Sequence, residues 1–131
     1  MRIRQTGIFV TDQASALEFY TKILGFVKKL DITSGNYRWL TVVAPEDQEG
    51  TQLVLSPNSN PTEKTYQEGI FKQGIPASMF FVDDLHSEVQ RLKKAGVGFT
   101  MEPTKVTGST IAMLNDTCGN LIQLTQLDWK M

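Results

Sequence analysis

Apolar and polar positions in the first sixty residues follow two different periods. In residues 3–11 the side chains alternate, imperfectly, in the way that is typical of a strand. Apolar residues from Leu17 to Leu24 then recur at helical spacing, so that a helix is expected to begin after Asp12 and to end at Gly25. The three β-rich stretches that follow are residues 26–32, 37–43 and 51–55. The pattern predicts a strand, a helix and three strands.

The same succession of patterns returns in the second half of the chain. The segment MFFVDDLHSEVQRLKKAGVGF, from Met79, matches GIFVTDQASALEFYTKILGF, from Gly7, at a shift of 72 residues through the strand and the turn. Asp12 then corresponds to Asp84, and the second helix is expected to end at Gly96. GTQLVL at 50–55 also matches GNLIQL at 119–124, at a shift of 69. An internal repeat of this length predicts two similar structural units.

The repeat predicts an α+β protein made of two tandem βαβββ modules within one compact domain. The expected first module is 1–58 and the second is 77–131, with 59–76 as a connecting loop. Residues 56–76 are rich in Pro, Asn, Ser and Gly, and the stretch is long for a simple connection. It is either a linker or a loop that covers a binding site, and its apolar residues Tyr66 and Phe71 indicate that it packs against something.

Charge and composition exclude several classes of partner. A formal net charge of −1 gives no electrostatic reason to expect nucleic acid or an anionic membrane. No apolar run approaches the roughly 20 residues of a membrane-spanning helix, and the first residues lack the apolar core of a signal peptide. The single cysteine, Cys118, excludes an intrachain disulfide and suits a reducing compartment. We therefore expect a cytoplasmic protein without a nucleic-acid or membrane partner.

Three segments carry a resemblance to a known family. VTDQASALEFYTKILGF, FFVDDLHSEVQRLKKAGV and NDTCGNLIQL resemble the vicinal oxygen chelate superfamily, which includes glyoxalase I, bleomycin-resistance proteins and extradiol dioxygenases. The resemblance implies that the mixed sheets of the two modules curl into a cup-like cavity. It also implies a small-molecule ligand or a metal inside that cavity, and a homodimer.

The resemblance further implies where a metal would bind. Metalloenzymes of the family draw their ligands from the inner strands of both modules, and the corresponding positions here are Gln5, Val54, Ala77 and Gln123. Gln52 is an alternative to Val54 if the register shifts by two residues. Valine and alanine offer no donor atom, and two neutral amides without an anionic partner do not offset the dehydration of a divalent cation. We expect no bound metal and no cofactor.

Other chemistry-bearing residues have structural interpretations. His86, the only histidine, lies just inside the second predicted helix on its polar side. Asp84 is expected to cap that helix, and Asp83 to be a loop residue. Cys118 stands in a turn without a neighbouring cation that would lower its pKa. No catalytic residue is identified, and whether the protein is an enzyme stays open.

Strand alternation places Tyr37, Trp39 and Thr41 on one face of a strand. If that face is concave, Trp39 lines an apolar pocket of the kind that binds small molecules. The predicted ligand-binding residues are Gln5, Tyr37, Trp39, Val54, Ala77 and Gln123. The favoured hypothesis is binding of a small apolar or aromatic molecule without a metal. The alternative is a metal-dependent glyoxalase-like lyase or isomerase, or a dioxygenase, that uses Gln5 and Gln123 as ligands.

Overall fold

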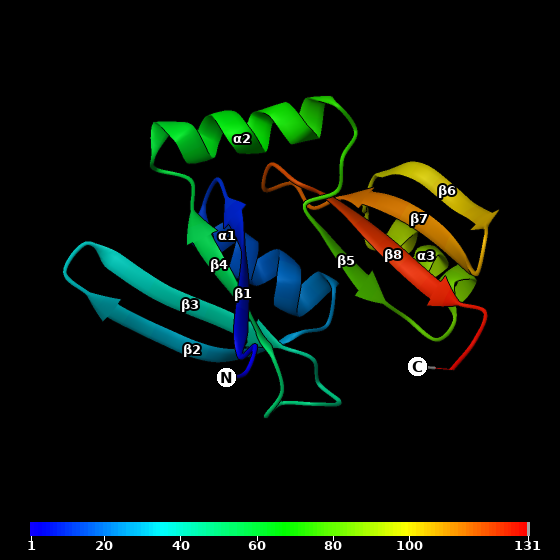
Figure 1. Ribbon diagram of the computed structural model, residues 1–131, viewed down its shortest axis with the longest axis horizontal. Coiled ribbons are helices and arrows are strands. Elements are labelled where there is room, and N and C mark those ends of the chain that lie inside the picture. The colour runs from blue at the N-terminus through cyan, green and yellow to red at the C-terminus, as the bar shows by residue number, and fades with distance from the viewer. Residues whose placement is uncertain (131) are drawn as a thin grey trace. The chain divides into compact units, whose positions relative to one another are not determined.

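The computed structural model describes residues 1–130, which fold into two compact units (Figure 1). The first comprises Met1–Gln67 and the second begins at Glu68. The elements of the first unit are β1 (Gln5–Val10), α1 (Gln13–Glu18), a π-helical segment η1 (Phe19–Ile23), β2 (Val27–Ser34), β3 (Tyr37–Val43) and β4 (Gln52–Pro57). Those of the second are β5 (Ser78–Phe81), α3 (Leu85–Lys94), β6 (Phe99–Val106), β7 (Ser109–Asn115) and β8 (Leu121–Leu127). Each unit is a βαβββ module, as the repeat predicts.

The two sheets share one topology. The strand orders are β1-β4-β3-β2 and β5-β8-β7-β6, and in each sheet the first two strands are parallel while the others are antiparallel. Register confirms the repeat, because Gly7 pairs with Val54 in the first sheet and Met79 pairs with Gln123 in the second. These pairs correspond under the shifts of 72 and 69 residues found in the sequence. Both sheets are open and mixed.

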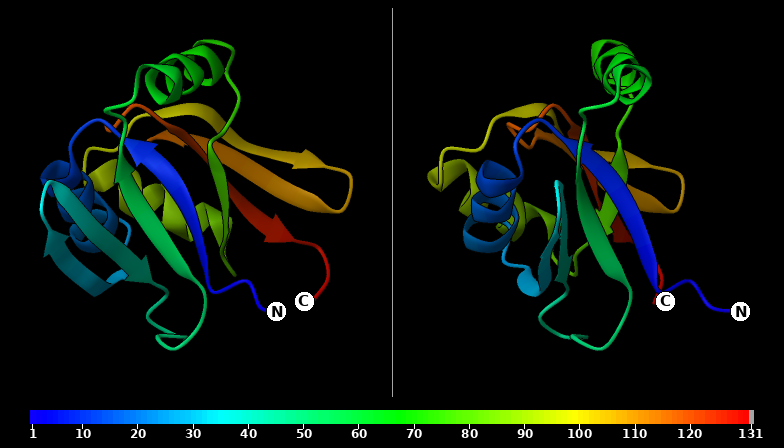
Figure 2. Two further views of the ribbon diagram at one scale, coloured as in Figure 1. Left: turned by 60° about the vertical axis from the view of Figure 1, so that its left-hand side comes forward. Right: turned by 90° about the vertical axis from the view of Figure 1, so that its left-hand side faces the viewer.

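A helix covers one face of each sheet (Figure 2), and most of the buried side chains of the sheets lie on that face. In the first unit, α1 packs against β4, and the fully buried residues include Val10, Tyr20, Leu40 and Leu55. In the second unit, α3 packs against β6, β7 and β8. Its apolar stripe, Leu85, Val89 and Leu92, is buried as the helical spacing predicts. The residues expected to bind a ligand lie on the opposite face of each sheet.

The predicted helix boundaries are confirmed at both repeats. Asp12 and Asp84 accept hydrogen bonds from the backbone N–H groups of Ser15 and Ser87 and so cap α1 and α3. These bonds also lower the pKa of both carboxyl groups. The first helix was expected to be a continuous α-helix, but it changes to the π-helical segment η1 at Phe19.

The stretch 59–76, which was expected to be a connecting loop, instead contains a helix, α2 (Pro61–Lys72). Asn60 begins it, since its side-chain oxygen accepts from Thr62 N at 2.8 Å, and Pro61 suits the first helical position because a proline there loses no hydrogen bond. Buried Gln67 holds the helix to the first unit: it accepts from Asn58 Nδ2 at 2.7 Å and donates to Phe9 O at 2.9 Å. None of the helices within residues 1–130 has the length and apolarity needed to cross a bilayer.

Candidate functional site

The first sheet presents an open face on the side opposite α1. Paired residues lie on the same face of a sheet, so the pairs Gln5–Gln52 and Thr41–Val54 place these four side chains on the open face together. Trp39 is two residues from Thr41 on β3 and points the same way. Gln5 and Trp39 therefore lie on the same face of the first sheet.

A polar cluster of Gln5, Gln52, Thr41 and the Leu30 backbone occupies this face. The Leu30 N–H donates to Thr41 Oγ1 at 3.1 Å, and the Thr41 hydroxyl donates to Gln52 Oε1 at 2.9 Å. Gln5 Nε2 donates to the same Gln52 oxygen at 3.0 Å. Within residues 1–130, neither Nε2 of Gln52 nor Oε1 of Gln5 has a hydrogen-bond partner, so the first can donate and the second can accept. No side-chain N or O atom is both buried and unpartnered in residues 1–130, so both groups are open to a ligand.

The polar cluster borders an open pocket with a volume of about 890 Å³, here called the Trp39 pocket. It is lined by Met1, Arg2, Ile3, Arg4, Gln5, Leu30, Trp39 and Gln52. Met1, Ile3, Leu30 and Trp39 are its apolar residues, and the two glutamines and two arginines carry its hydrogen-bonding groups. A mostly apolar pocket with few polar groups is typical of a small-molecule site.

Two of the other expected residues in the first module lie outside this lining. Tyr37 is on the same face as Trp39 but stands at the start of β3, where half of its surface is exposed. Val54 also lies on this face, paired with Gly7 and Thr41, and is partly buried. Gln52, which the sequence left as an alternative to Val54, is the residue of this strand that reaches the Trp39 pocket.

The expected residues of the second module lie on the second sheet. Ala77 precedes β5 and donates its backbone N–H to Leu121 O at 2.8 Å. Gln123 Nε2 donates to Thr125 Oγ1 at 3.1 Å and to Met79 Sδ at 3.4 Å. The open face around Gln123 is apolar, because Met79 and Phe81 share it and both are about half exposed. The second module therefore offers apolar surface with one amide.

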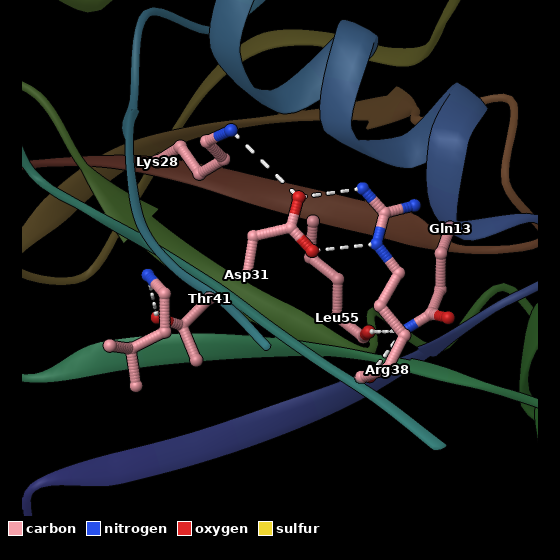
Figure 3. A network of polar contacts seen from close by, with 7 residues as sticks. Gln13, Lys28, Asp31, Arg38, Thr41 and Leu55 are labelled. Atoms are coloured by element: carbon pink, nitrogen blue, oxygen red, sulfur yellow. Dashed lines mark hydrogen bonds and ion pairs between the residues drawn. The ribbon is translucent and has the colours of Figure 1, made fainter. Parts of the chain in front are cut away.

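The Arg38 guanidinium lies on the opposite face of β3, near α1, and is paired (Figure 3). It donates to both oxygens of Asp31, at 2.8 and 2.9 Å, while Lys28 lies 3.8 Å from the same carboxylate. Gln13 Nε2 donates to the backbone oxygens of Arg38 and Leu55, both at 2.9 Å. The bidentate contact lowers the pKa of Asp31 and raises that of Arg38. This arginine is used internally rather than as an anion contact in the pocket.

The donor atoms do not fit the metal site that the family resemblance implies. The amide oxygen of Gln52 already accepts two hydrogen bonds, and Val54 and Ala77 have no donor atom in their side chains. Among residues 1–130, no three His, Cys, Asp or Glu side chains gather closely enough to hold an ion. Divalent first-row cations are held by imidazole, thiolate or carboxylate groups. We therefore derive no chemistry through a metal.

The remaining candidates have the structural roles expected of them. His86 is exposed on α3. Cys118 is fully buried in the turn before β8, where its N–H donates to Asp116 Oδ1 at 2.7 Å. Asp116, also fully buried, accepts from the backbone and the side chain of Asn120. This carboxylate organises the turn.

Sequence reasoning missed five lining residues, Met1, Arg2, Ile3, Arg4 and Leu30. Leu30 is brought to the open face by an irregularity in the β2–β3 register between Lys28 and Leu30, which no sequence pattern announces. Arg2 and Arg4 had a visible signal, because the segment MRIRQ places two cations immediately before Gln5. Their proximity to Trp39 depended on the pairing of strands that are distant in sequence.

Comparison with known proteins places these features in a family context. The model of the family described as "Glyoxalase/Bleomycin resistance protein/Dioxygenase superfamily" matches residues 2–124. "Uncharacterized protein YurT" of Bacillus subtilis strain 168 is 56% identical over 126 residues, covering 96% of this chain and 99% of its own length. A "Probable lactoylglutathione lyase" of Vibrio cholerae is 30% identical, with coverage of 95% and 90%.

Solved structures agree with the fold. The crystal structure of UcmS2 superposes with a TM-score of 0.83 at 35% identity, covering 95% of this chain and 97% of that one. TnmS3, described as an antibiotic binding protein from Streptomyces sp. CB03234, superposes with a TM-score of 0.78 at 26% identity, with coverage of 98% and 97%. Similarity thus extends over both modules.

Proposed function

The chain belongs to the glyoxalase/bleomycin resistance protein/dioxygenase superfamily, and from this premise we propose that it binds a small apolar or aromatic molecule without a metal. The observation that carries the proposal is the Trp39 pocket, where an indole ring and the Leu30 side chain stand beside two amides with free hydrogen-bonding groups. Such a site buries an aromatic body and orients it through a few polar contacts. The description of TnmS3 as an antibiotic binding protein supports binding rather than turnover.

The second module has an apolar open face of its own. Gln123 is flanked by exposed Met79 and Phe81, and thioether and aromatic groups adapt to planar ligands. We place Gln5, Trp39 and Gln52 as primary contacts. Tyr37, Val54, Ala77 and Gln123 lie outside the lining of the Trp39 pocket, and we do not place them in contact with its ligand.

A fluorescence titration tests the proposal. The chain has two tryptophans, so the variant Trp129→Phe leaves Trp39 as its sole indole. N-phenyl-1-naphthylamine, a neutral aromatic probe, is expected to quench Trp39 saturably and to bind with one site per chain, with or without EDTA. Trp39→Ala in the wild-type background should lower the affinity for the probe, measured through the fluorescence of the probe itself, by at least roughly tenfold, or about 1.4 kcal/mol.

Tyr37→Ala is the matched control for this experiment. It also removes an aromatic residue from the same face of β3, but outside the Trp39 pocket. Its affinity for the probe should stay within about twofold of wild type, since an exposed residue away from the ligand contributes little to binding. Absence of saturable binding, or equal loss in both variants, contradicts a ligand site at Trp39.

A lyase is the second candidate, favoured by the Vibrio cholerae relative described as a probable lactoylglutathione lyase. It requires Gln5 and Gln123 to hold a metal with help from other donors, which the neutral and partly occupied donor set disfavours. An assay for lactoylglutathione lyase activity with added Ni²⁺ or Zn²⁺ distinguishes the candidates. Turnover that Gln5→Ala abolishes favours the lyase.

We further propose a cytoplasmic homodimer. The exposed apolar side chains Met79 and Phe81 support association, because large apolar patches mark interfaces or ligand sites. Light scattering on a sizing column measures the mass directly, and a monomer of 14.7 kDa at micromolar concentration contradicts the dimer.

A further inference from the structure

The Trp39 pocket has a charge that its apolar wall does not explain. Arg2 and Arg4 both line it, and its lining contains no Asp or Glu. Within residues 1–130, neither guanidinium lies within ion-pair distance of a carboxylate. The other two arginines differ in this respect, since Arg38 pairs with Asp31 and Arg91 pairs with Glu88. The two unpaired arginines thus gather at the pocket of a chain whose net charge is −1.

The polar cluster adds hydrogen-bond donors that an anion can accept, beside one free acceptor, Oε1 of Gln5. Gln52 Oε1 is occupied by Gln5 Nε2 and Thr41 Oγ1, so Gln52 offers its N–H donors to the pocket. An anion accepts such donors, and arginine binds planar carboxylate or sulfonate groups through two parallel N–H bonds. A cationic ligand would meet two guanidinium groups of the same sign without a carboxylate to compensate.

We propose that the ligand of the Trp39 pocket is an aromatic anion, whose ring packs on Trp39 and Leu30 and whose acidic group is bound by Arg2, Arg4 and Gln52. This inference rests on the proposed function, since it specifies the class of ligand for the same site. It also predicts a selectivity that the apolar wall alone would not produce. Charge-assisted hydrogen bonds are stronger than neutral ones, so the acidic group should improve the affinity measurably.

Two probes that differ by one sulfonate test the proposal. 8-Anilinonaphthalene-1-sulfonate has the aromatic body of N-phenyl-1-naphthylamine and adds the anion. In low salt the sulfonate probe is expected to bind at least about tenfold more tightly than the neutral one, and the difference should shrink as salt screens the charges. Both titrations should weaken in Trp39→Ala, which assigns the binding to the Trp39 pocket.

Charge variants identify the residues responsible. The double variant Arg2→Gln/Arg4→Gln should reduce the affinity for the sulfonate probe by roughly tenfold and the affinity for the neutral probe by much less. Arg2→Lys/Arg4→Lys, which retains the charge, should keep a preference for the sulfonate. Lys64→Gln/Lys94→Gln removes the same charge from exposed positions outside the pocket and should affect neither probe. Unchanged melting temperatures verify that all variants are folded.

The outcomes separate this inference from the proposed function. If the neutral probe binds in a Trp39-dependent manner but the sulfonate gives no gain, the pocket binds ligands and the anionic class is wrong. The anionic class is also wrong if Lys64→Gln/Lys94→Gln loses as much affinity for the sulfonate probe as Arg2→Gln/Arg4→Gln does. If neither probe depends on Trp39, the proposed function fails and this inference fails with it.

Discussion

Gln5 and Gln52 are register partners on the parallel strands β1 and β4, and the side-chain amide of Gln5 donates to that of Gln52 at 3.0 Å. The contact links the first residue of one strand to the first residue of another that lies 47 positions further along the chain. It fixes which amide groups face the Trp39 pocket, and it uses the Gln52 oxygen that a metal would need.

The first prediction concerns metal binding. Protein purified without an N-terminal tag should contain far less than one equivalent of metal per chain, and Ni²⁺, Zn²⁺, Mn²⁺ or Fe²⁺ should not raise its melting temperature. A ligand specific for the folded state, present at 100 times its dissociation constant, adds about 2.7 kcal/mol, which a thermal shift detects readily. Unit stoichiometry with a stabilising shift contradicts the interpretation of the donor set.

The second prediction concerns Gln67, whose buried amide joins α2 to the first unit. Gln67→Ala leaves Asn58 Nδ2 and Phe9 O without this partner, and unsatisfied buried polar groups cost about 1–3 kcal/mol. Urea denaturation should show a loss of that size. The control Gln90→Ala removes an exposed glutamine from α3 and should change stability by less than about 0.5 kcal/mol. Equal effects in both variants contradict an anchoring role for Gln67.

The third prediction concerns Thr117, which has a φ angle of 62° in the turn before β8. This left-handed conformation is unfavourable for a β-branched residue and is tolerated by asparagine. Thr117 is exposed, so Thr117→Asn should stabilise the protein by about 0.5–1 kcal/mol through relief of strain. Thr33→Asn, at an exposed position of β2, should be neutral or destabilising. A Thr117→Asn variant less stable than wild type contradicts strain at this turn.

The sequence predicted the fold well because it contains the same unit twice. The recurrence of Asp12 as Asp84 and the match of Val54 with Gln123 located both helix starts and both final strands, and the register of the sheets agrees with them. α2 was missed because the residues that lead into it, SPNSNP at 56–61, are typical of a loop, although Asn60-Pro61 is also a helix start signal. The loop-like composition of this stretch thus hid a helix start signal that consists of only two residues.

The candidate site was harder to predict than the fold. Strand alternation correctly put Trp39 and Thr41 on one face, but alternation does not say how far along the strand a pocket extends. Tyr37 shares that face and lies outside the Trp39 pocket lining for this reason. The choice between Gln52 and Val54 depended on the pairing of β1 with β4, which comes from tertiary structure.

The last prediction concerns the pH dependence of stability at the Asp31–Arg38 pair. Hydrogen bonds from Arg38 hold the pKa of Asp31 below its ordinary value of 3.8. A carboxyl group whose pKa is lower in the folded state contributes stability that is fully present above the unfolded-state pKa. That contribution is lost as the pH falls through the folded-state value. Asp31→Asn should therefore be less stable than wild type at neutral pH, and the difference should shrink as the pH falls below about 3.8.

Urea denaturation at a series of pH values, from neutral to the acid limit of the folded state, measures this difference. Glu46→Gln, at an exposed position without an ion pair, serves as the control and should follow wild type throughout. A difference between Asp31→Asn and wild type that stays constant with pH would mean that the bidentate contact acts through geometry alone. Gln13 of α1 also donates a hydrogen bond to the backbone oxygen of Arg38 in β3. Because this bond does not depend on Asp31, α1 and β3 should stay in contact when the Asp31 charge is lost. Ligand binding in the Trp39 pocket, on the other face of β3, should then be retained in Asp31→Asn.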